Sequence, residues 1–156
     1  MIPDIKAVAL DVDGVLTDGT FLWDTNGGEI KRFSFRDVMG IARATRSGIK
    51  FALISGEKNV IVDRYAAKLE IAHVWQGCKD KAAALHEFAD LQSLGLEKIC
   101  FMGDDINDLP AMQLAGFTAA PADAHASVLA IAKFCTKKTG GNGAVREMLD
   151  FLFSKL

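Results

Sequence analysis

The stretch Asp11-Val12-Asp13-Gly14-Val15-Leu16-Thr17 follows directly on the apolar run Ile5–Leu10. This run predicts a buried strand, so the carboxylates of Asp11 and Asp13 stand where that strand ends. Two acids this close repel each other and lose hydration on burial, and a divalent cation would offset both costs. Asp13 alone would be a turn residue before Gly14, and Asp11 alone a cap, but the whole run at this position favours a functional site.

A second acidic stretch, Gly103-Asp104-Asp105-Ile106-Asn107-Asp108, follows another apolar run, Ile99–Met102. Oxygen ligands of this kind suit Mg²⁺, which prefers a few carboxylates together with waters and a substrate phosphate. Asn107 or Asp108 could instead cap the next helix, but a single cap does not account for the whole row. Together the two stretches predict a magnesium site where two strands end.

Short apolar runs alternate with amphipathic segments along the chain, which predicts strands alternating with helices. The predicted strands are Ile5–Leu10, Ile49–Ile54, Ala72–Trp75, Ile99–Met102, Phe117–Ala120 and Phe134–Thr136. The predicted helices are Gly40–Ser47, Val60–Leu69 (cap Asn59), Lys81–Leu94 (cap Asp80), Leu109–Leu114, Ala124–Ala132 (cap Asp123) and Ala144–Leu156. The turn residues Asn26-Gly27-Gly28 predict a hairpin between Thr20–Trp23 and Glu29–Phe33.

The predicted fold class is α/β: a Rossmann-like parallel sheet flanked by helices, with a small projecting β-hairpin and no cap domain. The chain, residues 1–156, reads as one domain. The intervals from Asp11 to Ser55 and from Ser55 to Asp104 leave no room for a separate lid. Ligands of such sheets bind beyond the carboxyl ends of the strands, which is where the polar stretches lie.

The composition argues against several other classes. The formal net charge is −2 and the charges are interspersed, so no basic stripe indicates a nucleic-acid partner. No apolar run reaches the roughly 18 residues of a membrane span. The N-terminus lacks a secretory signal, so we expect a cytoplasmic protein with no membrane partner. The three cysteines form no metal-ligand pattern, which suits a reducing compartment, and we expect Cys100 and Cys135 in the core.

Two further elements are weak signals when taken alone. Ser55-Gly56 follows the predicted strand Ile49–Ile54, where a hydroxyl and backbone amides can hold phosphate oxygens, although Ser-Gly is also an ordinary turn. Lys81 could neutralise a nucleophile and a phosphate, with Lys79 as a rival. A lone lysine at a helix start is more often a solvated charge.

In this order the four elements resemble the motifs of the haloacid dehalogenase-like phosphohydrolases, over nearly the whole chain. The resemblance implies a magnesium-dependent phosphatase that forms an aspartyl-phosphate intermediate on Asp11. It makes Asp13 the general acid and then the general base, so the pKa of Asp13 should be raised in the complex. It makes Ser55 and Lys81 the groups that hold the transferring phosphoryl group.

The same resemblance implies the metal ligands. Magnesium would be bound by Asp11, by the backbone carbonyl of Asp13 and by Asp104. Either Asp105 or Asp108 would complete or orient the metal shell, and the sequence does not separate the two.

Four segments are similar to the capless group that contains 3-deoxy-D-manno-octulosonate 8-phosphate phosphatase. They are residues 13–19, 35–40, 75–77 and 140–147. The similarity implies hydrolysis of that sugar-acid phosphate, a step of lipopolysaccharide biosynthesis, and a homotetramer in which a neighbour helps to close the site. Phe21, Leu22 and Trp23 on the hairpin suit such an interface, although they could equally fold back on their own core.

The resemblance also yields candidate substrate-binding residues: Gly56, Arg36, Glu57, Arg64, Lys68 and Arg146. One of them departs from the pattern, because octulosonate enzymes usually carry arginine where this chain has Glu57. Phosphatases of nine-carbon acids, such as 2-keto-3-deoxynononate or N-acylneuraminate 9-phosphate, are similar in their Glu-Lys pair and in Lys68. The substrate therefore stays open between the two, with the octulosonate placed first because its pathway is the commoner one.

Other classes fit the pattern less well. A phospho-receiver domain has its acidic pair after the first strand and its phospho-acceptor after a later one, which disagrees with the order of motifs here. A catalytically inactive oligomerisation module would lose Asp11, Asp13 or Asp104, and all three are present. A phosphomutase usually needs a lid, for which this chain has no room.

Overall fold

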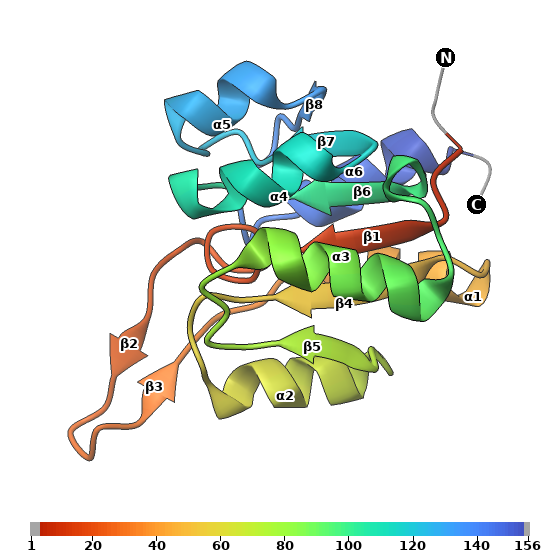
Figure 1. The fold of residues 1–156 in the computed structure, drawn as a ribbon. Helices are drawn as coiled ribbons and strands as arrows, with labels where there is room; N and C mark the ends of the chain where they lie inside the picture. The colour runs from red at the N-terminus through yellow and green to blue at the C-terminus, as the bar shows by residue number, and fades with distance from the viewer. Residues whose placement is uncertain (1–3, 155–156) are drawn as a thin grey trace.

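The computed structural model describes residues 4–154, and a six-stranded parallel sheet of order β5-β4-β1-β6-β7-β8 forms its centre (Figure 1). The strands are β1 (Ala7–Leu10), β4 (Lys50–Ile54), β5 (His73–Trp75), β6 (Ile99–Met102), β7 (Phe117–Ala120) and β8 (Phe134–Cys135). The α/β prediction is confirmed. Because β4 and β6 flank β1, the strand order reverses beside β1, which is where ligands of such sheets bind.

Helices cover both faces of this sheet. One face carries α1 (Phe35–Arg46), α2 (Val60–Lys68) and α6 (Ala144–Leu152), and the other carries α3 (Lys81–Gln92), α4 (Leu109–Leu114) and α5 (Ala126–Ile131). The side chains of β1 alternate between two hydrophobic cores: Val8 and Leu10 face the first group of helices, and Ala7 and Ala9 face the second. None of the helices in residues 4–154 is both long and apolar enough to cross a membrane.

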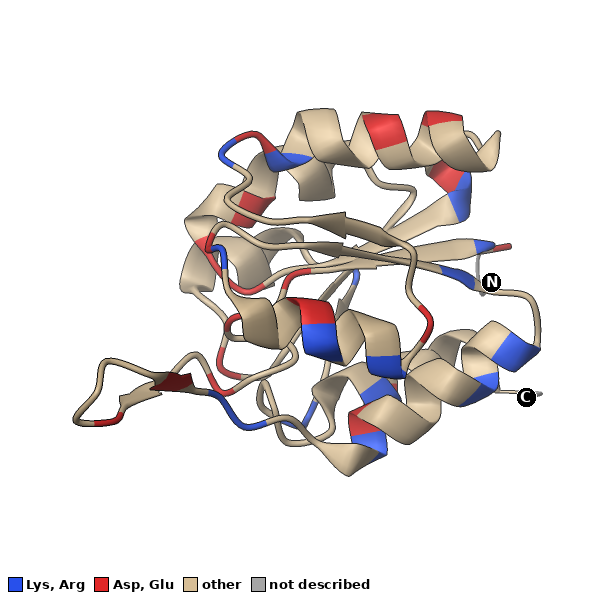
Figure 2. Ribbon diagram, turned by 90° about the horizontal axis from the view of Figure 1, so that it is seen from below, with Lys and Arg blue, Asp and Glu red and all other residues tan. Residues whose placement is uncertain are grey.

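A hairpin projects beyond the sheet at the edge where β1 ends (Figures 1 and 2). Its strands β2 (Leu22–Trp23) and β3 (Glu29–Ile30) pair antiparallel, as the turn residues predicted. Leu22 and Trp23 are 67% and 71% exposed, and Phe21 is 49% exposed. The alternative in which these side chains fold back on their own core is therefore wrong, because the hairpin carries them away from it.

Two predicted helix starts are wrong. The first helix begins at Phe35 instead of Gly40, after Ser34, whose side chain accepts a hydrogen bond from the Arg36 amide. Glycine is a poor helix former, and here its role is packing: a Cβ at Gly40 would press against Arg146 of α6.

The helix α5 begins at Ala126 and is capped by His125, so Asp123 is not its cap. The Asp123 carboxylate instead accepts a hydrogen bond of 2.9 Å from the Gly140 amide, which ties this loop to the glycine-rich segment before α6. Cys100 is buried as predicted, but Cys135 is exposed because β8 is the edge strand of the sheet. Residues 155 and 156 of the predicted last helix lie outside the described part of the chain.

A buried carboxylate joins the first helix to the last one. Asp37 on α1 is fully buried, and its Oδ1 accepts a hydrogen bond of 2.8 Å from the Arg146 amide in the first turn of α6. Gly143, the residue before α6, provides no side-chain cap, so the Asp37 carboxylate takes over this task from another helix. Burial raises the pKa of Asp37, and nearby amides of α6 oppose that shift in part.

Asp37→Ala should destabilise the protein by about 2 to 3 kcal/mol, because it removes a charged acceptor and leaves buried amides of α6 without a partner. Asp37→Asn should cost less, since its amide oxygen can still accept the Arg146 hydrogen bond. Denaturant unfolding of the two variants and the wild type measures both losses. Equal losses for the two variants would show that the hydrogen bond does not stabilise α6.

The pH dependence of unfolding should separate the wild type from Asp37→Asn. Because its pKa is raised on folding, Asp37 binds a proton more tightly in the folded protein than in the unfolded chain. The stability of the wild type relative to Asp37→Asn should therefore fall as the pH rises from about 4 through the raised pKa. A relative stability that rises over this range would contradict the assignment.

Candidate active site

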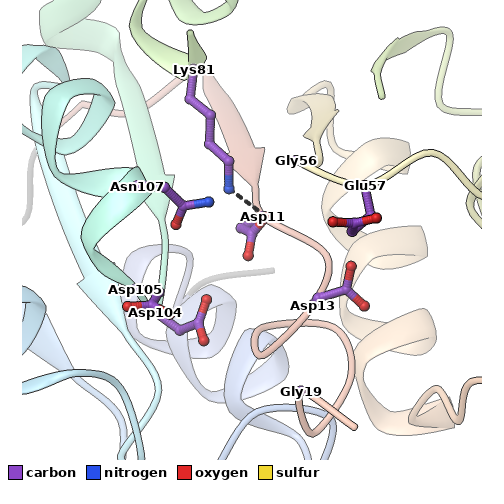
Figure 3. A pocket seen from close by; sticks show the side chains of 9 residues that line it. All are labelled: Asp11, Asp13, Gly19, Gly56, Glu57, Lys81, Asp104, Asp105 and Asn107. Carbon is purple, nitrogen blue, oxygen red and sulfur yellow. Dashed lines mark hydrogen bonds and ion pairs between the residues drawn. The ribbon is translucent and has the colours of Figure 1, made fainter. Parts of the chain in front are cut away.

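The predicted acids meet in a cavity of about 250 Å³ at the carboxyl ends of β1 and β6. Asp11 and Asp13 enter it from the end of β1, and Asp104 enters from the loop after β6 (Figure 3). The described residues that line the cavity are Asp11, Asp13, Gly19, Gly56, Glu57, Lys81, Asp104, Asp105 and Asn107. Gly19 and Asn107 were not assigned to the site from the sequence, since neither stands out in its motif by residue type.

Lys81 is the buried cation of this site. Its Nζ lies 2.7 Å from Asp11 Oδ1 and 2.7 Å from Asp108 Oδ1, and its side chain is only 2% exposed. These bonds require Lys81 to stand in the first turn of α3, where the Asp80 cap fixes the helix start. Lys79, the rival candidate, is exposed and lines no part of the cavity that the structure describes.

Three carboxylates face this one cation. One oxygen each from Asp11, Asp104 and Asp108 can be chosen so that all lie within 4.8 Å of one another. Burial, followed by the charge of Asp108, raises the pKa of Asp11 well above its ordinary value, although Lys81 opposes the shift. Burial likewise raises the pKa of Asp104 to about 6. The cluster therefore holds more negative charge than Lys81 neutralises.

Gly14 makes room for one of these carboxylates. It has a φ of +92°, and a Cβ at this position would overlap with the carboxylate of Asp104. Only glycine satisfies both conditions without strain. The glycine of the first acidic stretch therefore lets the loops after β1 and β6 approach each other.

The structure separates Asp108 from Asp105, which the sequence left open. Asp108 is fully buried: its Oδ1 is bonded to Lys81, and its Oδ2 accepts from the amides of Asp104 and Asp105 at 2.9 and 3.1 Å. Asp105 is exposed and caps the 3₁₀ helix η2 (Ile106–Asp108) through the Ile106 amide. Asp108 thus fixes both Lys81 and the loop that carries Asp104. The next helix, α4, has no side-chain cap from Asp108.

Asp13 has a partner that the sequence did not reveal. Lys31, just after β3, donates a hydrogen bond to Asp13 Oδ1, and its side chain is only 3% exposed. Its Nζ also lies 3.4 Å from Glu29 Oε1. Lys31 follows a short hairpin strand, 18 residues from Asp13, so no strand-end rule singles it out.

The residues after β4 divide between the cavity and its wall. Ser55 is fully buried, and its Oγ accepts a hydrogen bond of 3.3 Å from the Glu57 amide, so it supports the loop from behind. Gly56 and Glu57 line the cavity, and Figure 3 shows the Glu57 carboxylate facing the side of the cavity that holds Asp13. The loop therefore presents an anion, not a cation, to whatever enters.

The four basic residues proposed for substrate binding lie outside this cavity. Arg36 and Arg146 line a second hollow beside α6, where Arg146 Nε is bonded to Asp150 at 2.8 Å. Arg64 and Lys68 line an apolar hollow on α2, where Lys68 Nζ lies 5.6 Å from the Phe35 ring centroid. Within one chain, none of the four contributes to the lining of the active-site cavity.

Comparison with known proteins adds an independent line of evidence. A family model for haloacid dehalogenase-like hydrolases matches residues 70–149, which contain Lys81, Asp104 and Asp108. The chain is 40% identical over 149 residues to 3-deoxy-D-manno-octulosonate 8-phosphate phosphatase of Escherichia coli K12. That match covers 96% of this chain and 79% of the relative.

Solved structures agree with the sequence match. The same phosphatase from Yersinia pestis superposes with a TM-score of 0.96 at 37% identity, covering 98% of this chain and 83% of that one. The Moraxella catarrhalis enzyme, solved with magnesium, phosphate and KDO, gives a TM-score of 0.95 at 37% identity, covering 98% and 88%. The chain therefore belongs to the haloacid dehalogenase-like hydrolases, within the group of 3-deoxy-D-manno-octulosonate 8-phosphate phosphatases.

Proposed function

We propose that this protein is a magnesium-dependent phosphatase that hydrolyses 3-deoxy-D-manno-octulosonate 8-phosphate to the free sugar acid and phosphate. The observation that carries the proposal is the buried ion cluster at the end of β1, in which Lys81 joins Asp11 to Asp108 at 2.7 Å each. Phosphoryl transfer needs positioning and charge neutralisation above all, and this cluster supplies both. The relative from Moraxella catarrhalis, with its magnesium, phosphate and KDO, supports the substrate.

The residues fit a magnesium ion. Carboxylate oxygens of Asp11, Asp104 and Asp108 cluster within 4.8 Å, and burial raises the pKa of Asp11 and of Asp104, an effect that a bound cation would oppose. Both oxygens of Asp108 already have protein partners. We therefore assign the ligand role to Asp11, Asp104 and the backbone carbonyl of Asp13, with Asp108 orienting them. When bound, Mg²⁺ would offset the repulsion between an anionic nucleophile and an anionic phosphate.

We infer the roles of the side chains from the family resemblance, and their positions in the cavity support these roles. Asp11 attacks phosphorus, and Lys81 neutralises charge on the nucleophile and on the phosphoryl oxygens. Asp13 gives its proton to the leaving sugar oxygen and later accepts one from the attacking water. Ser55 supports the loop whose Gly56 backbone faces the phosphoryl group.

The proposal includes a homotetramer in which the hairpin of one subunit contacts other subunits. The exposed side chains Phe21, Leu22 and Trp23 form an apolar surface on the hairpin, which suits burial against other copies in a homotetramer. Since Arg36, Arg64, Lys68 and Arg146 lie outside the cavity of their own chain, a neighbouring subunit is the route by which any of them would reach a sugar acid. A cytoplasmic location would match a phosphorylated substrate.

A nine-carbon sugar acid is the second candidate substrate. Glu57 lines the cavity where octulosonate phosphatases usually have arginine. An anion at this position accepts hydrogen bonds from hydroxyl or amide groups and repels a carboxylate, which sugar acids of both lengths carry. The similarity of the Glu57-Lys58 pair to the nine-carbon enzymes is what supports 2-keto-3-deoxynononate or N-acylneuraminate 9-phosphate as the alternative.

Magnesium should stabilise the wild-type protein. At a concentration of about 100 times its Kd, bound Mg²⁺ adds about 2.7 kcal/mol, which is a rise in Tm of about 5 to 10 °C for a domain of this size. Asp104→Asn should lose most of this shift, while Asp90→Asn, an exposed acid on α3, should retain it. Differential scanning fluorimetry measures all three proteins. An unchanged wild-type Tm would contradict the metal site.

The Mg²⁺ concentration needed for half of this shift should depend on pH. Because the pKa of Asp104 is about 6 without metal, this group carries a proton below that pH and must lose it to bind a cation. The midpoint concentration should therefore rise up to about tenfold per pH unit below 6 and level off above it. A midpoint that stays constant between pH 5 and 7 would show that Asp104 is not a ligand.

The substrate is tested by phosphate release with Mg²⁺ from four kinds of compound: the octulosonate 8-phosphate, 2-keto-3-deoxynononate 9-phosphate, N-acetylneuraminate 9-phosphate and hexose phosphates. We expect a kcat/KM for the octulosonate at least about tenfold above the others, because a pocket built for one sugar acid leaves polar groups unpaired with another. Asp11→Asn and metal-free protein should release no phosphate. A preference for a nine-carbon acid would select the second candidate, and no release at all would overturn the phosphatase proposal.

A further inference from the structure

Lys31 joins the hairpin to the active site through a partly buried hydrogen bond. It follows β3, and its Nζ donates to Asp13 Oδ1 while its side chain is almost fully shielded from solvent. A charge-assisted hydrogen bond of this kind restricts the geometry of both partners.

A chain of polar contacts holds Lys31 in place. Glu29 Oε1 lies 3.4 Å from Lys31 Nζ and accepts a hydrogen bond of 2.7 Å from Asn59 Nδ2. Asn59 caps α2 through its side chain, and its backbone amide donates a hydrogen bond of 2.7 Å to Gln76 Oε1. Lys31 is thus anchored to the segments that follow β4 and β5, so its ammonium group has little freedom to leave Asp13.

We propose that Lys31 is the positioning residue of the general acid, acting on the reaction through Asp13 without touching the phosphate. By holding Oδ1, it fixes the orientation of the Asp13 carboxyl group and leaves Oδ2 available to the leaving group. In the first step the Asp11–phosphorus bond forms and the bond from phosphorus to the sugar oxygen breaks. The electron pair of that bond stays on the sugar oxygen, which takes the Oδ2 proton of Asp13. This inference rests on the proposed phosphatase function.

Leaving-group dependence distinguishes this role from a merely structural one. A sugar alkoxide is a poor leaving group that needs a proton, whereas p-nitrophenolate leaves without one. Lys31→Met should therefore lower kcat/KM for the sugar-acid phosphate by about 10² to 10³, which is the usual range for general acid catalysis. With p-nitrophenyl phosphate, the first-turnover burst of p-nitrophenolate should fall by less than about tenfold, because Asp11 and Lys81 are unchanged.

Two further variants complete the test. Lys31→Arg should recover most of the loss, since a guanidinium can still donate to Asp13. Lys50→Met removes an exposed lysine at the start of β4, at the opposite end of the strand from the active site. This variant should behave as the wild type. The Mg²⁺-induced rise in Tm should persist in Lys31→Met, which shows that the variant is folded with its acid cluster intact.

The outcomes separate the two proposals. Equal losses with both substrates, or no loss with the sugar-acid phosphate, would overturn the positioning role while leaving the phosphatase function in place. Failure of the wild type itself to form a phosphoenzyme would refute the proposed function, and the inference with it. A loss confined to the sugar-acid phosphate and reversed in Lys31→Arg would support the role of Lys31.

Discussion

The bond network of Lys81 is the constraint around which the other parts of the site are arranged. A buried lysine between two carboxylates at 2.7 Å is stable only if all three groups are held together, because any one of them alone would be an uncompensated buried charge. Asp11 comes from β1, Lys81 from α3 and Asp108 from η2, so the network fixes three elements that are distant in the sequence. The position of Asp104 then follows from the hydrogen bonds of Asp108 to the loop amides.

Glycines let the backbone come close enough for this network to form. Gly14 leaves space for the carboxylate of Asp104, and a Cβ at Gly140 would overlap with the carbonyl of Gly14. The loop after β1 is thus enclosed between the loop after β6 and the segment before α6. Asp123 adds to this enclosure by accepting a hydrogen bond from the Gly140 amide.

The strands and the acids at their ends could be predicted because both depend on local signals: apolar runs, turn residues and carboxylates in sequence. The start of α1 could not be predicted, because Gly40 weakens the helix signal. A glycine is needed there because Arg146 of α6 packs against it, which the sequence does not show. The choice between Asp105 and Asp108 needed the position of Lys81. The role of Lys31 could not be predicted, because its hydrogen bond to Asp13 forms only when the chain folds. Which hollow a basic residue such as Arg64 lines could not be predicted, because charge alone does not tell which surface a helix presents.

The link between α1 and α6 has a consequence for how the protein is made. The buried side chains of α6, Val145 and Met148 among them, complete the core on the face of the sheet that α1 and α2 share. In the sequence, α6 follows all the strands of the described sheet. The Arg146 amide that donates to Asp37 lies 109 residues further along the chain. The apolar face that α6 covers therefore stays uncovered until α6 has been synthesised. Exposed apolar surface of this kind makes a partly synthesised chain prone to aggregation.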